Sequence, residues 1–292
     1  MQYRVRHRTT YRYLQDVAQS WHLSHLLPRT TPNQSVETRQ VSLSPEAGSR
    51  VLREDYFGNA CEWYFFNAVH DHLEIVAESH VTVDPAPERD AGASLAWEEV
   101  RRLLEAAQDP EARDAVQYVF DSPLSAFTSD LPSYALESFT PGRPILEAAT
   151  ELMQRIHDEF RYDTTVTDAT TPVDKVFEIR AGVCQDLAHV AIAAMRSLGL
   201  PARYVSGYLL TQPPPGMPRM LGADASHAWF SVYAPPYGWV DLDPTNNVLV
   251  GEGHVTAAWG RDYGDVVPVG GIILGGHDHV IEVGVDVIPA TE

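Results

Sequence analysis

The segment from Gly182 to Pro201 constrains the fold most, because it combines helical periodicity with a cysteine at its start. After Cys184, apolar residues recur at helical spacing, and Gly199 with Pro201 ends the pattern. A thiol in the first turn of a helix lies beside unpaired N–H groups and the positive end of the helix dipole, which favour the thiolate. The segment therefore predicts a helix with a reactive, inward-facing thiol; an inert core cysteine is the alternative. The thiol shares its face with Leu187, Ala188, Ala191 and Met195.

Two short segments downstream alternate between polar and apolar residues, as strands do. Residues 226–233 place His227 and Trp229 on one face and Ala228 on the other. Residues 239–243 alternate again after an Ala-Pro-Pro-Tyr-Gly turn. The pattern predicts a β-hairpin centred near Pro236.

The register of this hairpin selects a partner for the histidine. With the turn at that position, Trp229 lies opposite Asp243, and His227 becomes the diagonal neighbour of Asp243 on the same face. Asp241 shares the face but lies opposite Ser231, deeper in the hairpin. A slip of one residue would remove the pairing. The register therefore favours Asp243 as the partner of His227; the alternative is a satisfied histidine and an aspartate that only starts a turn.

A cysteine, a histidine and an aspartate in these positions suit amide chemistry. His227 can accept the Cys184 proton and later protonate a leaving amine, while Asp243 fixes the imidazole tautomer. The backbone N–H of Cys184 is a candidate oxyanion donor. Further candidates for oxyanion or substrate contacts are Tyr162, Gln185 and Trp229, although Tyr162 also fits a packed aromatic residue at a helix end.

Asp186 bears on the same chemistry, because a carboxylate facing the thiol would oppose thiolate formation. Gln185 and Asp186 both lie in the first turn, where they suit the helix dipole. The helical wheel places Asp186 off the inward face, so we expect it not to face Cys184.

Four motifs occur in an order that resembles the bacterial transglutaminase-like superfamily. They are Gly-Val-Cys-Gln-Asp-Leu-Ala-His-Val, Leu-Gly-Leu-Pro-Ala-Arg-Tyr-Val-Ser-Gly-Tyr, Ser-His-Ala-Trp-Phe and Trp-Val-Asp-Leu-Asp-Pro-Thr-Asn. The resemblance implies a papain-like core of helix and sheet, acyl transfer through a thioester, and Cys184, His227 and Asp243 as nucleophile, base and acidic partner. The first 85 or so residues also resemble the β-rich domain that often precedes this core in bacteria.

The expected class is therefore α+β, in four parts. Residues 1–86 predict an antiparallel β-sandwich domain, and residues 87–140 predict a helical linker with a wrapped loop after residue 121. A transglutaminase-like core occupies residues 141–260, with its catalytic helix packed on an antiparallel sheet. Residues 261–292 predict a terminal strand, on the core sheet or joining the two domains. A Pro-rich loop at residues 212–222 is a candidate border of the cleft.

Three functions remain open on the sequence. We favour a cysteine protease or amidase that hydrolyses a peptide or protein amide, with transglutamination possible, because no dedicated amine site is evident. The alternatives are a catalytically silent scaffold protein and an acyltransferase that uses a thioester donor. The substrate, the acyl acceptor and the oligomeric state are not evident from the sequence.

Charge and composition exclude several other classes. The net charge of −19 disfavours nucleic acid and anionic membranes as partners, and no apolar run approaches the ~18 residues of a membrane helix. The polar start does not resemble a signal peptide, so we expect a cytoplasmic protein. We expect no metal or other cofactor, because Cys-x-x-Cys and His-Glu-x-x-His are absent. Cys61 and the His70-Asp71-His72 turn are interpreted as structural.

Overall fold

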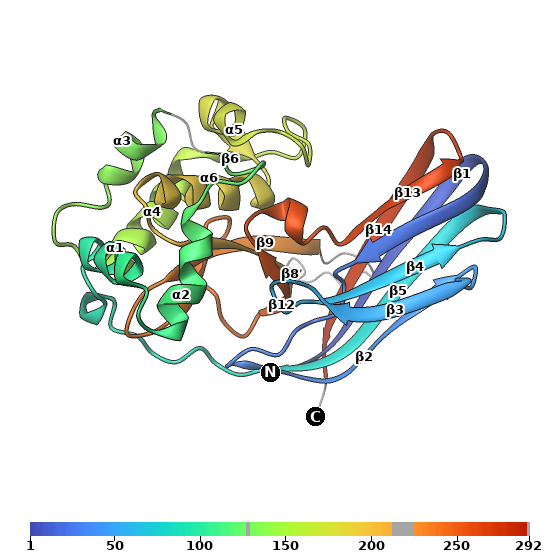
Figure 1. The fold of residues 1–292 in the computed structure, drawn as a ribbon, viewed down its shortest axis with the longest axis horizontal. Helices are drawn as coiled ribbons and strands as arrows, with labels where there is room; N and C mark the ends of the chain where they lie inside the picture. The colour runs from blue at the N-terminus through green and yellow to red at the C-terminus, as the bar shows by residue number, and fades with distance from the viewer. Residues whose placement is uncertain (127–128, 212–224, 291–292) are drawn as a thin grey trace, which may run out of the picture.

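The computed structural model describes residues 1–126, 129–211 and 225–290. An all-β unit forms one end of the molecule, and a unit of helices packed on a second sheet forms the other (Figure 1). The two ends of the chain meet, since the amide of Ala290 donates to the carbonyl of Gln2 at 2.8 Å. No helix in the described part of the chain is long and apolar enough to cross a membrane.

The all-β unit is organised around one long strand, β1 (Gln2–Ser24). One edge of β1 pairs antiparallel with β5 along its first half and with β4 along its second half. Among the described residues the strands form one curled sheet, with the order β2-β5-β1-β4-β3 along this path, rather than two separate sheets. The other strands on the path are β2 (Gln34–Ser44), β3 (Ser49–Glu54), β4 (Ala60–Phe66) and β5 (His70–Val83).

The C-terminal residues complete this sheet and do not join the core sheet. Strands β13 (Val269–Gly275) and β14 (His279–Pro289) both pair antiparallel with the other edge of β1. The glycine-rich residues before the terminal strand form β13, a second strand where the sequence had predicted one. Gly271 explains part of this composition, because a Cβ there would lie 2.4 Å from the ring of His22. Glycine permits the close approach of the two strands.

The connecting segment contains helices, and one of them lies where a wrapped loop was expected. Residues 131–136 fall in the expected wrapped loop, yet they form α3, because Leu131, Tyr134 and Ala135 bury their side chains in the core. Helix α2 begins at Pro110, with Asp109 as its N-cap. The helices of this segment are α1 (Trp97–Ala106), α2 (Pro110–Val116) and α3 (Leu131–Leu136), with short 3₁₀ turns at Ala91–Ala93 and Gln117–Val119.

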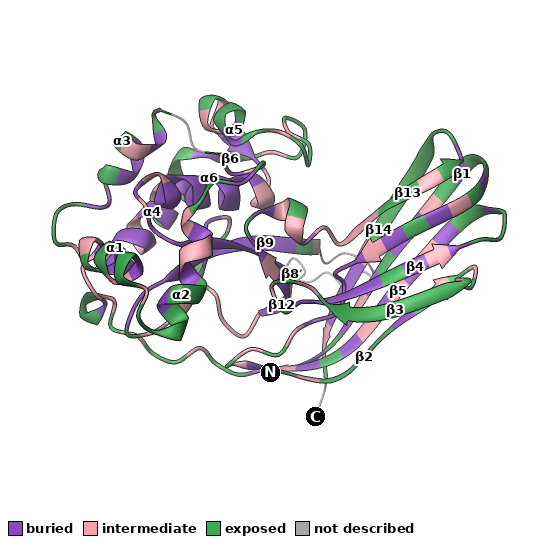
Figure 2. Cartoon of the chain, viewed as in Figure 1, coloured by how far each residue is buried: buried purple, intermediate pink, exposed green. Residues whose placement is uncertain are grey.

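The core places one buried helix, α6 (Cys184–Ser197), between other helices and a sheet. Residues from Asp186 to Arg196 are buried without interruption, and Figure 2 shows α6 among the purple segments. A helix that is buried on all sides suits the centre of a domain. The described strands of the core sheet run antiparallel in the order β11-β10-β9-β8-β12. They are β8 (Ala202–Leu209), β9 (Ala225–Tyr233), β10 (Trp239–Asp243), β11 (Val248–Leu249) and β12 (His254–Gly260). Helices α4 (Ile145–Glu159) and α5 (Val173–Ile179) also pack against α6.

Two side-chain amides join the units through the core edge strand β12 (His254–Gly260). Gln34 donates to the carbonyl of Thr256 and accepts from its amide, both at 2.8 Å. Asn59 does the same with Trp259, at 2.8 and 2.9 Å. Each amide therefore satisfies backbone groups along the outer edge of this strand; the carbonyl of Thr256 also accepts from the amide of Arg29, at 3.3 Å.

Candidate active site

Cys184 is the first residue of α6, preceded by the extended residue Val183. A two-residue parallel ladder leads into this turn, with β6 (Arg161–Tyr162) paired to β7 (Ala181–Gly182). The thiol is half-buried and free of any disulfide. The predicted position of the cysteine, at the start of a helix, is confirmed.

Asp186 is buried, although the helical wheel placed it off the inward face. Its carboxylate accepts hydrogen bonds from the amide of Val183 at 2.8 Å and from Thr167 Oγ1 at 2.7 Å. Burial raises the pKa of Asp186, although these two hydrogen bonds oppose the rise. The third side chain of a helix folds back to cap its start, a direction that Cβ periodicity does not reveal. Gly182 leaves room for it, because a Cβ there would lie 2.5 Å from the carboxylate.

The hairpin that carries His227 and Asp243 has the predicted register. Strands β9 (Ala225–Tyr233) and β10 (Trp239–Asp243) pair with Asp241 opposite Ser231. His227 and Asp243 are both buried, and His227 Nε2 lies 2.8 Å from Asp243 Oδ2. A carboxylate can only accept, so this nitrogen carries the proton.

The imidazole also interacts with the Cys184 thiol, which contributes to its pKa. Burial alone would lower the pKa of His227, but the hydrogen bond to Asp243 and the interaction with Cys184 outweigh it and raise the pKa to about 10. Because Asp243 engages Nε2, Nδ1 is the ring nitrogen left for sulfur. A histidine that holds its proton this strongly can act as the general acid beside a nucleophilic sulfur.

Asp243 is the centre of a larger network than the sequence indicated. Its Oδ2 also lies 3.0 Å from His254 Nε2 and accepts from Asn246 Nδ2 at 2.7 Å. Its Oδ1 accepts from the amides of Thr245 and Asn246. Burial would raise the pKa of Asp243, but these bonds, with that of His227, hold it well below its ordinary value. Asn246 closes the fourth motif and could have been noticed; His254, on β12, has no local signal.

The same three residues could hold a metal ion. The ligand atoms of His227, Asp243 and His254 lie within 4.8 Å of one another, and all three residues are buried. Two imidazoles and a carboxylate form a donor set that suits Zn²⁺. An ion at this place would take the imidazole of His227 away from its hydrogen bonds, so it would compete with the cysteine chemistry.

The three predicted substrate contacts lie in different surroundings. Tyr162 is 54% exposed. Partial burial raises the pKa of its phenol, and the nearby Cys184 adds to this rise. Gln185 donates its side-chain amide to the carbonyl of Ala169 at 3.0 Å. Trp229 is fully buried, and its indole donates to Asp241 at 3.2 Å, which is the geometry of a supporting residue. The predicted cleft loop at 212–222 lies outside the described residues.

The residues interpreted as structural lie in the N-terminal sheet. Cys61 is buried and free. His70 hydrogen-bonds with Ser20 and the carbonyl of Ala68, while His72 pairs with Asp71. In the part of the chain that the structure describes, this turn does not form a metal-binding group.

Comparison with known proteins places this geometry in a family. The model of the transglutaminase-like superfamily matches residues 133–244, which include Cys184, His227 and Asp243. The model of the bacterial transglutaminase-like N-terminal region matches residues 3–82. An uncharacterised protein of Mycobacterium tuberculosis is 39% identical over 295 residues, covering 98% of this chain and 92% of the relative. The chain belongs to the transglutaminase-like superfamily. Its expected α+β class is thereby confirmed.

Two further similarities place this transglutaminase-like protein among its relatives. A crystal structure from Cytophaga hutchinsonii, provisionally named a cysteine protease, shares the fold, with a TM-score of 0.75 and 19% identity over 100% of this chain and 92% of that one. A protein-glutamine gamma-glutamyltransferase of Pseudomonas aeruginosa is 34% identical over 101 residues, covering 33% of this chain and 15% of that protein.

Proposed function

We propose that the protein hydrolyses an amide or peptide bond of a peptide or protein substrate, by acyl transfer through a thioester on Cys184. The observation that carries the proposal is the imidazole of His227, which hydrogen-bonds to a buried carboxylate and whose pKa is raised both by that carboxylate and by the Cys184 thiol. A thiolate beside an imidazolium is a strong nucleophile at neutral pH.

The reaction follows from these contacts. The Cys184 thiolate attacks the carbonyl carbon, and the C–N bond breaks as His227 protonates the leaving amine. Water then attacks the thioester, giving its proton to His227, and the acid leaves as the thiol is regenerated. Asp243 stabilises the imidazolium and keeps Nε2 protonated, so that Nδ1 faces the sulfur in each proton transfer.

The start of α6 supplies the remaining electrostatic assistance. The amide of Cys184 is unpaired within the helix, so it can donate to the oxyanion of the tetrahedral intermediate. One such donor lowers the barrier by about 3 kcal/mol. Tyr162 stands on the exposed rim beside the thiol, where its hydroxyl could reach the acyl group or the leaving group.

Intact-mass spectrometry with a peptide-amide probe and an acyl-thioester probe tests the proposal. We expect an acyl adduct with the peptide probe that is absent in Cys184→Ala and retained in Cys61→Ala, the matched control. Acylation by the thioester probe alone would identify an acyltransferase, and no adduct with either probe would identify a scaffold protein.

A second measurement tests whether water or an amine accepts the acyl group from Cys184. With an excess of a primary amine present, hydrolysis predicts the free acid as the main product, whereas an amide product would assign transglutamination. The Pseudomonas aeruginosa relative, named as a transferase, is the reason to include this arm. We also propose the cytoplasmic location, which suits two free cysteines; cell fractionation tests it.

A further inference from the structure

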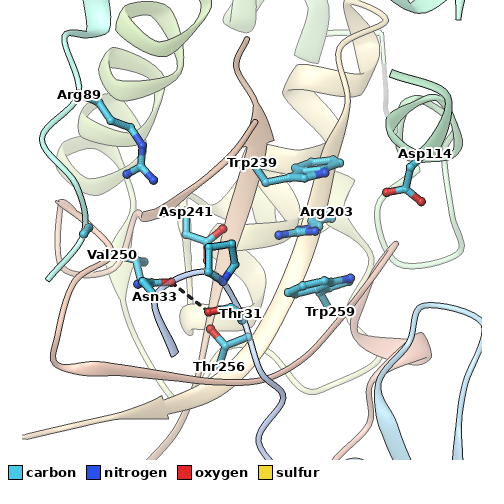
Figure 3. Close-up of a pocket in the computed structure, with 12 residues that line it drawn as sticks. Thr31, Asn33, Arg89, Asp114, Arg203, Trp239, Asp241, Val250, Thr256 and Trp259 are labelled. Atoms are coloured by element: carbon cyan, nitrogen blue, oxygen red, sulfur yellow. Dashed lines mark hydrogen bonds between the residues drawn. The ribbon is translucent and has the colours of Figure 1, made fainter. Parts of the chain in front are cut away.

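Two tryptophans and two arginines form a stack at the junction of the two units. The guanidinium carbon of Arg203, on β8 (Ala202–Leu209), lies 4.4 Å from the ring centroid of Trp239 and 3.8 Å from that of Trp259. Arg29 also lies over the ring of Trp259, with its guanidinium carbon 3.2 Å from the ring centroid. Figure 3 shows Arg203 between the two indole rings. Both faces of its guanidinium are therefore occupied, and only its edge is free to bind.

Arg203 is a buried cation that forms no ion pair with the residues the structure describes. Its residue surface is 6% exposed, and its Nε is buried without a hydrogen bond. Among the described residues no carboxylate forms an ion pair with it, whereas Arg29 is bound by Phe57 and Asn59. An unpaired buried charge costs much free energy unless something else satisfies it. Burial lowers the pKa of Arg203, and nearby Asp241 only partly opposes this.

The edge of Arg203 lines a cavity of about 270 Å³. The cavity also contains Arg89 from the linker, Asp241 from β10 and Asp114 from α2 (Figure 3). Cys184, His227 and Asp243 do not line it. Its size is near the lower end of small-molecule sites, which begin at roughly 300 Å³. The cavity is therefore a separate site, built where the N-terminal unit, the linker and the core meet.

We propose that this cavity binds a small zwitterion of amino-acid or dipeptide size, with its carboxylate on Arg203 and its ammonium on Asp241. A planar guanidinium presents two parallel N–H groups along one edge, the arrangement that a carboxylate accepts. Arg89 adds a second cation on the same wall.

The acidic residues of the cavity are the reason to expect an ammonium group on this ligand. Two arginines and two aspartates line the cavity, so their formal charges cancel, and a ligand without net charge keeps that balance. A dianion such as phosphate would be repelled by Asp241. Asp241 uses Oδ2 to accept from Trp229, and no hydrogen bond to Oδ1 occurs within the described residues. Oδ1 is the acceptor for the ammonium.

Isothermal titration calorimetry with glycylglycine tests the site, supported by tryptophan fluorescence because Trp239 and Trp259 form its walls. We expect binding that saturates as the glycylglycine concentration approaches roughly 10 mM, which a Kd of about 1 mM would produce. Glycylglycinamide lacks the carboxylate, and N-acetylglycylglycine lacks the ammonium; each should bind more weakly. Equal binding of either control, or no binding of glycylglycine, overturns the assignment.

Substitutions of the cavity residues test whether glycylglycine binds at this site. Arg203→Lys keeps the charge but loses the paired N–H groups, so it should weaken glycylglycine binding by about tenfold or more. Arg12→Lys, an exposed pair member on β1, is the matched control and should bind as the parent protein does. Arg89→Gln serves if the Arg203 variant does not fold. Cys184→Ala should bind normally, because the site is independent of the thiol. Unchanged affinity in both pocket variants would contradict the proposal.

Discussion

Replacing Asp243 by asparagine isolates the role of the buried carboxylate with almost no change of shape. Two backbone amides, those of Thr245 and Asn246, donate to Oδ1, so the oxygen of the new side chain must stay there. The new amide nitrogen then takes the place of Oδ2 and donates toward His227 and His254. His227 must accept at Nε2, which moves its proton to Nδ1, the nitrogen that should receive the thiol proton.

The expected loss follows from this tautomer change. A triad imidazole held in the wrong tautomer loses about 10⁴-fold in kcat. Because Asn246 and His254 offer other partners and the new side chain can partly adapt, we expect a loss of about 10³- to 10⁴-fold. This corresponds to about 4–5.5 kcal/mol in the activation barrier.

The assay compares kcat and KM for Asp243→Asn and Asp71→Asn with the peptide probe that acylates Cys184. Asp71 pairs with His72 on the exposed N-terminal sheet, so this control removes the same charge from a histidine–aspartate pair away from the site. The loss should appear in kcat, with the melting temperature recorded for both variants. A loss below tenfold in a folded Asp243→Asn protein, or an equal loss in the control, would refute the tautomer argument.

Three further predictions concern pH, metal ions and the junction of the two units. The pKa of His227 is raised to about 10. Its contribution to stability is therefore complete below its unfolded pKa of about 6.5 and is lost as pH rises toward about 10. The melting temperature should fall with pH across this window, and His227→Gln should remove this dependence. Asp243 acts in the opposite sense: its lowered pKa stabilises the fold above about pH 4, and this contribution is lost as pH falls. Zn²⁺ should inhibit the enzyme reversibly through the three-residue group, with recovery in chelator and weaker inhibition in His254→Gln, while an equal inhibition constant in that variant would rule out this group. Gln34→Ala should lower the free energy of unfolding by about 1–3 kcal/mol, because it leaves the amide of Thr256 without a partner and its carbonyl with only the longer hydrogen bond from the amide of Arg29; Gln40→Ala, on the exposed side of the same strand, should change it little in urea denaturation.

Local periodicity was sufficient for the central elements of the site. The helix at Cys184 and the hairpin of His227 and Asp243 depend on neighbouring residues and on one turn, so their spacing carries the information. The side chain of Asp186 escaped this reasoning, because a capping side chain turns back along the chain. Helix α3 escaped it as well, since its proline and its serine are typical of loops and only burial against the core makes it helical.

The sequence by itself determined which residues meet when the contact is local in register: a thiol at a helix start, and an imidazole diagonal to a carboxylate across a short hairpin. Only the tertiary structure decided the contacts between distant strands. It brought His254 to Asp243, returned the last two strands to β1, and stacked Arg203 between Trp239 and Trp259. These contacts depend on how a sheet curls and which edges remain unpaired, and such long-range pairing leaves no periodic signal in the chain.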